Sequence, residues 1–263
     1  TSAIDKMVGI LGLRSAPHAN AGSIPPDQRP VVFIGPYEHH SNELPWRESI
    51  ADVVTIPEDR DGHVDLDTLR TELVEHADRP LRNGAFSAAS NVTGILTDTR
   101  AIARVLHEHG ALSFWEFAAA APYIEIDMNP ADDPFGYLDA VFLSPHKFVG
   151  GPGTPGVLAA RRELFGNPVP VVVGGGTVSY VNEIEHRYLA DPAHREEGGT
   201  PAIVESIRAG LVLQLKQAVG ADVIRDRETD FVRRAIGSWA AHPHIQILGN
   251  LGADRLAIVS FEI

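Results

Sequence analysis

The sequence predicts an α/β fold, a mostly parallel sheet covered by helices on both faces. Strand-like and helix-like segments alternate along the 263 residues, and the strand-like segments are apolar on both faces. Both features are typical of parallel sheets, because the crossover connections are helices that cover the sheet. Apolar residues make up 44% of the chain, and no apolar run reaches the roughly 20 residues that a membrane helix needs.

The first predicted helix covers residues 1–13, where Ile4, Met7 and Leu11 recur at the spacing of one helix face. A short apolar strand is predicted at 31–34. A Gly-Pro pair follows it directly and marks the end of regular structure.

The next three elements are a strand at 53–56, a helix at 66–76 and a strand at 84–90. The helix has Asp65 and Asp67 at its start, where carboxylates favour the positive end of the helix dipole. The third strand is rich in small residues, which is compatible with a close-packed sheet interior.

A second helix of this alternation is predicted at 98–109, and Gly110 is its stop signal. Apolar runs at 111–115, 140–143 and 157–160 are predicted strands. The alternation therefore continues across the middle of the chain.

The remaining elements are a strand at 169–173, long helices at 202–219 and 223–241, and a final strand at 256–261. A helix opens the sequence and a strand is barely under way at its end, so we expect a fragment of a longer protein. We expect residues 1–220 to form a large domain that lacks its N-terminal part. Residues 221–263 would then be the truncated start of a small domain.

Composition excludes several classes of function. A net charge of −13 disfavours nucleic-acid binding, which needs a basic patch. There is no cysteine, hence no disulfide or thiolate metal site, and no signal-peptide pattern at the N-terminus. We therefore expect a cytoplasmic protein without nucleic-acid or membrane partners. Lysine is rare, with Lys6, Lys147 and Lys216 alone, so each lysine needs an explanation.

Polar side chains follow four predicted strands. Ligands of an open parallel sheet bind beyond the carboxyl ends of its strands, so these side chains would converge on one site. A polar residue after a strand is also often only a turn former, and the prediction depends on all four occurring in order. They are His39, Asn91, Glu116 and the run Ser144-Pro145-His146-Lys147.

This set matches what pyridoxal phosphate requires. Lys147 offers the amine for a Schiff base, and Glu116 offers a carboxylate that keeps the pyridine nitrogen protonated. The ring of His39 could stack on the cofactor, and the amide of Asn91 could donate to its phenolic oxygen. Hydroxyl and backbone N–H groups at Ser144, His146 and the helix start at Thr1 suit a phosphate.

In these blocks the chain resembles the class V aminotransferase family, which includes the cysteine desulfurases, among the fold-type I pyridoxal-phosphate enzymes. The resemblance runs from Thr1 to about Gly210. It rests on Glu38-His39-His40-Ser41-Asn42, Pro45-Trp46, Ser90-Asn91-Val92-Thr93-Gly94, Gly110-Ala111-Leu112, Ala120-Ala121-Pro122, Ser144-Pro145-His146-Lys147, Gly151-Pro152-Gly153, Gly174-Gly175-Gly176 and Gly199-Thr200-Pro201.

The resemblance implies an aminotransferase or a cysteine-desulfurase-type lyase that acts on an amino acid. It implies that Lys147 and His39 are catalytic, and that the chain forms a homodimer in which Thr200 reaches the phosphate of the neighbouring subunit. The implied cofactor ligands are Thr1, His39, Asn91, Glu116, Ser144, His146, Lys147 and Thr200, with no metal ligand.

Two positions depart from the family pattern. Glu116 stands where the family has aspartate, and Ala119 stands where it often has glutamine. These departures leave open a second reading, a non-catalytic scaffold or binding subunit of the same fold. A metal-dependent hydrolase is a third reading, but His39-His40 lack a well-spaced third ligand. His107-Glu108-His109 is expected at a solvated helix end, because its histidines point to different sides of the helix.

Overall fold

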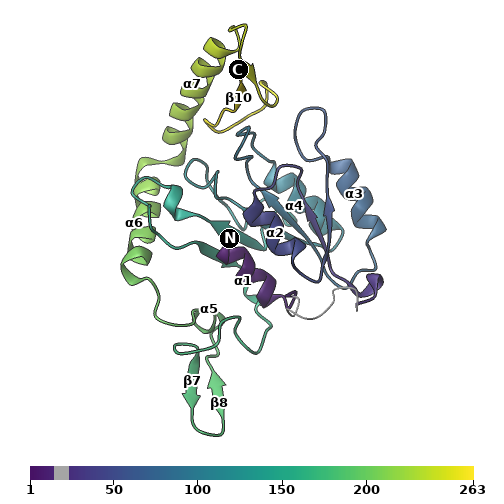
Figure 1. Cartoon of the computed structure of the whole chain (residues 1–263), viewed down its shortest axis with the longest axis vertical. Coiled ribbons are helices and arrows are strands. Elements are labelled where there is room, and N and C mark those ends of the chain that lie inside the picture. Colours follow the sequence, from purple (N-terminus) through teal and green to yellow (C-terminus); the bar gives the residue numbers. More distant parts are fainter. Residues whose placement is uncertain (15–23) are drawn as a thin grey trace.

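The computed structural model describes residues 1–14 and 24–263 and confirms the α/β fold (Figure 1). Its central sheet has six strands in the order β2-β1-β3-β4-β5-β6. Neighbouring pairs from β2 to β5 are parallel, whereas β6 runs antiparallel to β5. The strands are β1 (Val31–Ile34), β2 (Asp52–Thr55), β3 (Arg82–Ser87), β4 (Leu112–Glu116), β5 (Ala140–Leu143) and β6 (Val157–Ala160).

Helices cover both faces of this sheet, as predicted. On one face, α1 (Ser2–Ile10) and α2 (His40–Arg47) pack their apolar side chains against Val32 and Ile34 of β1. On the other face, α3 (Leu66–Glu75) and α4 (Thr99–Glu108) pack against Val31 and Phe33 of the same strand. Successive residues of β1 thus point to opposite cores, which explains why the strand is apolar throughout.

Side-chain caps fix the starts of α3 and α4. The Asp65 carboxylate accepts hydrogen bonds from the backbone N–H groups of Asp67 and Thr68, and Asp98 accepts one from Ala101. Each cap satisfies N–H groups that have no acceptor inside the helix. The helices therefore begin where the acidic residues of the sequence predicted.

The sequence did not predict α2, because Pro45 lies inside it. Proline removes one backbone hydrogen bond from a helix interior. The fully buried ring of Trp46 compensates by packing against Phe114 of β4, with the two ring centroids 6.1 Å apart. Burial of a large aromatic side chain outweighs the local preference here.

Two predicted strands are wrong or shorter than predicted. Residues 169–173 form no strand, and their valines are largely exposed, with Val173 at 61%. The hairpin of β7 (Val178–Val181) and β8 (His186–Tyr188) follows instead. Of the predicted strand at 256–261, only Phe261 lies in β10 (Phe261–Glu262), which pairs with β9 (Gln246–Ile247).

His107 does not lie at a solvated helix end. Its side chain is buried, and its Nε2 lies 2.8 Å from a carboxylate oxygen of Asp139. Its Nδ1 donates to the backbone carbonyl of Phe135. The ring also stacks on Tyr137. His107 therefore connects α4 to the segment before β5.

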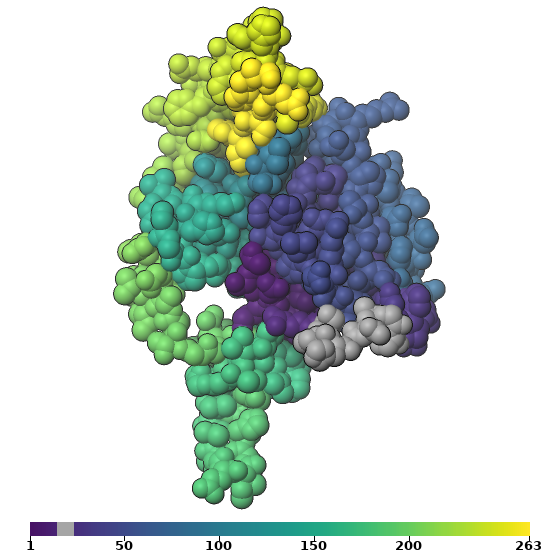
Figure 2. Space-filling model, in the orientation of Figure 1, coloured from purple at the N-terminus to yellow at the C-terminus, as the bar shows by residue number. Residues whose placement is uncertain are grey.

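The two long helices lie along one side of the molecule, and the β7–β8 hairpin projects at one end (Figure 1). They are α6 (Ile203–Val219) and α7 (Ala221–Trp239), joined at Gly220, whose φ of 91° favours glycine. Figure 2 shows an opening between α6 and the body of the molecule. A cavity of about 500 Å³ there is lined by residues of α1 and α6.

Short helices complete the described chain: η2 (Pro26–Gln28), η3 (Pro145–Lys147), η4 (Arg162–Leu164) and α5 (Pro192–Arg195). In residues 1–14 and 24–263, no helix combines the length and the apolar character that crossing a bilayer requires.

Leu69 and Val74 of α3 test the assignment of the core. Leu69 is fully buried, whereas Val74 is 64% exposed on the same helix. Leu69→Ala is expected to lower the free energy of unfolding by about 2–5 kcal/mol, since it leaves a cavity. Val74→Ala is expected to change it by less than about 0.5 kcal/mol. Urea unfolding curves compare the two variants, and equal effects would contradict the assignment.

Candidate functional site

The carboxyl ends of four parallel strands meet at one edge of the sheet and define the candidate site. Glu38 and His39 follow β1, Ser87 ends β3, and Glu116 ends β4. Lys147 lies on η3, directly after β5. Since these strands are neighbours in the sheet, the fold brings together groups that are far apart in the sequence.

Glu116 is a buried carboxylate at the end of β4. One oxygen, Oε1, accepts a hydrogen bond of 2.9 Å from the Ala118 N–H, and the other, Oε2, lies 3.4 Å from the Ser87 hydroxyl. Burial raises the pKa of Glu116, while the Ala118 hydrogen bond and the charge of Lys147 oppose this rise. The hydrogen bond from Ala118 holds the Glu116 carboxylate against the backbone two residues further along the chain.

Lys147 lies close enough to Glu116 and His39 for its charge to affect the pKa of both. Its residue is exposed, and no hydrogen bond or ion pair engages its amine within residues 1–14 and 24–263. Lys6, by contrast, pairs with Glu196, and Lys216 donates to the Ile124 carbonyl. Lys147 is thus the lysine whose amine is available for chemistry.

The loop after Lys147 is tightly folded. A side chain at Gly151 would place its Cβ 1.9 Å from the Pro145 carbonyl oxygen, so only glycine fits there. The Gly151 N–H donates to the Phe148 carbonyl, and the Lys147 N–H donates to the Ser144 carbonyl. These contacts fix the backbone of the lysine while its side chain stays exposed.

His39 caps the N-terminus of α2 and presents a flat ring at the site. Its Nδ1 accepts a hydrogen bond of 3.1 Å from the Ser41 N–H. Burial lowers the pKa of His39, and the nearby charge of Lys147 lowers it further. The ring is therefore a neutral imidazole, since an accepting nitrogen carries no proton.

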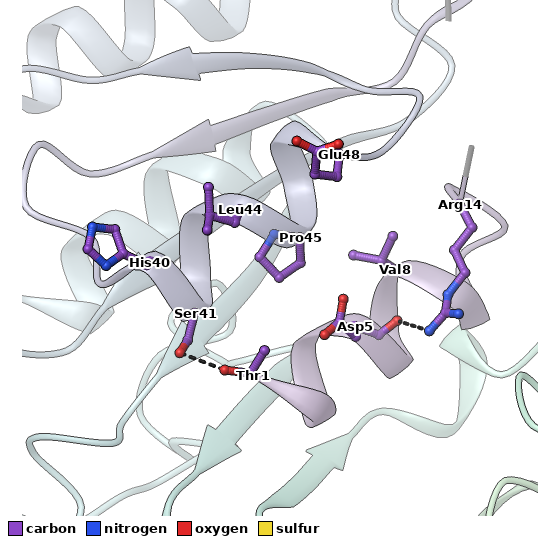
Figure 3. Close-up of a pocket in the computed structure, with 9 residues that line it drawn as sticks. All are labelled: Thr1, Asp5, Val8, Arg14, His40, Ser41, Leu44, Pro45 and Glu48. Atoms are coloured by element: carbon purple, nitrogen blue, oxygen red, sulfur yellow. Dashed lines mark hydrogen bonds between the residues drawn. The ribbon is translucent and has the colours of Figure 1, made fainter. Parts of the chain in front are cut away.

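Thr1 and Ser41 join the starts of α1 and α2. Their hydroxyl oxygens lie 2.8 Å apart, at one end of a groove between the two helices (Figure 3). In the described part of the chain, the N–H groups of Ser2 and Ala3 have no acceptor. Hydroxyls beside open helix N–H groups form a favourable environment for a phosphate.

The structure gives the remaining predicted ligands fewer contacts. Ser144 and His146 flank Lys147 on the same segment, and His146 is exposed. Asn91 is exposed on the turn after β3, and Thr200 is exposed before α6. No side-chain hydrogen bond of these four residues occurs among residues 1–14 and 24–263, so their roles stay predictions. Over the same ranges, no three metal-binding side chains come together.

Glu38 received no role from the sequence, although it belongs to the block that carries the family resemblance. Its carboxylate accepts hydrogen bonds from the N–H and hydroxyl of Ser87, at 2.9 and 2.5 Å, and from the Asn42 amide at 2.7 Å. Burial raises the pKa of Glu38 to about 7, and the charge of Glu116 adds to this rise. The only signal in the sequence was its place two residues past a Gly-Pro stop, beside His39.

The class-V aminotransferase family matches residues 16–263, nearly the whole chain. The chain belongs to this family. A "Probable cysteine desulfurase" of Halobacterium salinarum is 30% identical over 236 residues, which cover 88% of this chain and 54% of the relative. One of Staphylococcus epidermidis is 28% identical over the same shares. The chain thus spans about half the length of the curated relatives it matches.

Several solved structures share the fold. The cysteine desulfurase CsdA of Escherichia coli superposes with a TM-score of 0.79 at 21% identity, covering 99% of this chain and 60% of that one. The apo cysteine desulfurase of Thermococcus onnurineus gives 0.78 at 22% identity, over 100% and 62%. A C-DES mutant with glycine covalently linked to its PLP cofactor gives 0.73 at 18%, over 98% and 65%.

The donor set of this class-V chain fits pyridoxal phosphate. One edge of the sheet carries the exposed amine of Lys147, a carboxylate on the next strand, a neutral flat ring, and hydroxyls beside the helix N–H groups of α1. Each would suit one part of the cofactor: in order, the aldehyde, the pyridine nitrogen, the ring face and the phosphate.

The raised pKa of Glu38 predicts a pH-dependent stability. Its folded pKa of about 7 lies above the usual 4.5, so the folded state keeps a proton on Glu38 at pH values where the unfolded state has released it. The resulting loss of unfolding free energy is absent at pH values well below 4.5, grows as the pH rises, and is complete above pH 7. Replacement by glutamine removes this titration. Relative to wild type, Glu38→Gln should gain about 2 kcal/mol of unfolding free energy between about pH 5 and about pH 8.

Urea unfolding at several pH values measures this gain. Glu75→Gln, at an exposed glutamate of α3, is the matched control and should follow wild type throughout. Parallel pH curves for wild type and Glu38→Gln would show that Glu38 titrates as an ordinary exposed acid.

Proposed function

We propose that this chain is the cofactor-binding part of a pyridoxal-phosphate enzyme that acts on an amino acid, with Lys147 holding the cofactor as a Schiff base. The observation that carries the proposal is the exposed amine of Lys147 beside Glu116 and His39, which has no partner among the residues that the structure describes. The reaction class is that of an aminotransferase or a cysteine-desulfurase-type lyase. The relatives named as cysteine desulfurases favour the lyase.

Each residue has a separate task in this proposal. When bound, pyridoxal phosphate withdraws electrons from the α-carbon of the amino acid. With the cofactor bound, Lys147 would take the α-proton at Nζ and return it. Glu116 would face the ring nitrogen with its carboxylate, and His39 would cover one face of the ring. Thr1 and the open N–H groups of α1 bind the phosphate.

Reduction with sodium borohydride after incubation with pyridoxal phosphate tests the anchor. Peptide mass mapping should find the phosphopyridoxyl group on Lys147 and not on Lys6 or Lys216, because the other two amines are engaged. Lys147→Arg keeps the positive charge but cannot form the Schiff base, so it should lose the adduct and the turnover while keeping the fold. An adduct on either other lysine would refute the assignment.

A homodimer is also part of the proposal, with Thr200 reaching the neighbouring subunit. The support is the apolar surface of α6, where Ile203, Ile207 and Leu211 recur at one face and are each at least 58% exposed. Thr200 comes just before this helix and is itself exposed. A second subunit packed on α6 would cover the apolar face and bring Thr200 towards it.

Sedimentation equilibrium of Ile207→Asp, Leu211→Asp and the double variant tests the dimer. We expect wild type to be a dimer and the double variant to dissociate at least tenfold more readily, because each buried carboxylate costs desolvation energy. Val181→Asp on the exposed hairpin strand β7 is the control and should remain dimeric. A monomeric wild type would end this part of the proposal.

A non-catalytic scaffold of the same fold is the alternative, and one observation favours it. Ala119 is nearly buried and offers no side-chain donor where the family often has glutamine. A chain that dimerises but gives no borohydride adduct would support the scaffold over the enzyme.

Three expectations from the sequence remain predictions. They are the boundary between a large domain at 1–220 and a small domain at 221–263, a cytoplasmic location, and the lack of nucleic-acid or membrane partners. The net charge of −13 still supports the absence of nucleic acid.

A further inference from the structure

Glu38 occupies a built position beneath the candidate site. Three donors hold its carboxyl group: the Ser87 N–H, the Ser87 hydroxyl and the Asn42 amide. The Asn42 amide also donates to the Ala85 carbonyl of β3, which fixes its orientation. Gly35 leaves room for the carboxyl, since a Cβ there would lie 2.6 Å from Glu38 Oε1. The fold therefore makes space for this acid and satisfies it.

A single hydroxyl connects this acid to a second one. Ser87 Oγ lies 2.5 Å from Glu38 Oε2 and 3.4 Å from Glu116 Oε2. A serine hydroxyl has one hydrogen to donate and can also accept, so a protonated Glu38 donates to Ser87 Oγ while the Ser87 hydroxyl donates to Glu116. Two enclosed carboxylates that share one donor repel each other, so one proton on the pair relieves the repulsion.

The surroundings decide which acid holds this proton. Glu116 faces the charge of Lys147, and it accepts from the Ala118 N–H. Both favour its ionised form. Within residues 1–14 and 24–263, the charged or titratable groups that Glu38 faces are Glu116 and Tyr37, which offer no positive charge. The three hydrogen bonds that Glu38 accepts favour its ionised form, but they do not offset its burial, which raises its pKa to about 7. The proton therefore belongs on Glu38.

We infer that Glu38 is the proton-holding partner of Glu116 and that, through Ser87, it keeps Glu116 ionised to face a positively charged ring nitrogen. Glu38 is thus a positioning residue, and its role rests on the proposed function. When the negative charge moves between the two acids, the O–H bond of Glu38 breaks and its proton bonds to Ser87 Oγ. The original Ser87 proton moves to Glu116 Oε2, so the negative charge moves from Glu116 to Glu38 and nothing else is consumed.

Carbon-13 NMR of the 263-residue chain, labelled at the glutamate carboxyls, tests the inference with and without pyridoxal phosphate. Glu38→Gln and Glu116→Gln assign the two signals. We expect the Glu38 signal to titrate near pH 7, shifted from the usual 4.5. The Glu116 signal should show a smaller step at the same pH, because the two acids share Ser87. That step should vanish in Glu38→Gln.

Ser87→Ala removes the hydroxyl and keeps the strand, so it tests the connection itself. The step in the Glu116 signal should be lost or at least halved, while Glu75→Gln leaves it unchanged. A step of full size in Ser87→Ala would overturn the relay through Ser87. If the signal that titrates near pH 7 disappears in Glu116→Gln instead, the assignment of the proton is wrong. If Ser87→Ala does not fold, the loss of the step in Glu38→Gln still decides the coupling.

A failure of this inference can be distinguished from a failure of the proposed function. The carboxyl titrations need no cofactor, whereas the borohydride adduct at Lys147 needs no coupling between the acids. An adduct without coupled titration leaves the cofactor assignment intact and removes the role of Glu38. Coupled titration without an adduct retains the acid pair and removes the ring nitrogen as its target. With cofactor bound, the ring nitrogen of ¹⁵N-labelled pyridoxal phosphate should stay protonated in wild type and in Glu38→Gln.

Discussion

Parallel pairing of neighbouring strands is the constraint on which the rest of this structure depends. Because β1, β3, β4 and β5 run in one direction, their carboxyl ends meet at one edge of the sheet. An acid, a serine hydroxyl, a second acid and a lysine then meet there without any long insertion. The antiparallel β6 ends this arrangement, since its own carboxyl end points the other way. The site is therefore a direct consequence of strand direction.

Much of the sheet could be predicted from the sequence, since strands that are buried on both faces are continuous apolar runs. The helix starts at Asp65 and Asp98 were equally legible, because a cap is a local interaction. The failures have non-local causes. Helix α2 forms despite Pro45 because Trp46 is buried against a distant strand, and the valines of 169–173 lie outside the sheet, where the Val171 N–H donates to Glu196.

The sequence predicted several residues of the candidate site, but not the interactions between distant residues that set their pKa values. Lys147, Glu116 and His39 were found because each follows a strand, which is a feature of the sequence alone. The role of Glu38 was not, because it depends on Ser87, 49 positions away, and on the space left by Gly35. Similarly, His107 is buried because Asp139 lies opposite it. Such pairings depend on tertiary structure and leave no periodic pattern.

The tight turn around Lys147 also has a thermodynamic consequence. Its backbone is ordered before any ligand arrives, by the Ser144 carbonyl on one side and the crowded Gly151 on the other. In the proposed function, capture of a carbonyl compound by Nζ would cost the conformational entropy of the lysine side chain alone, on the order of 2 kcal/mol, and none for the main chain. A lysine on a loose loop would also have to order its backbone on binding, which costs about 1–2 kcal/mol of binding free energy per residue.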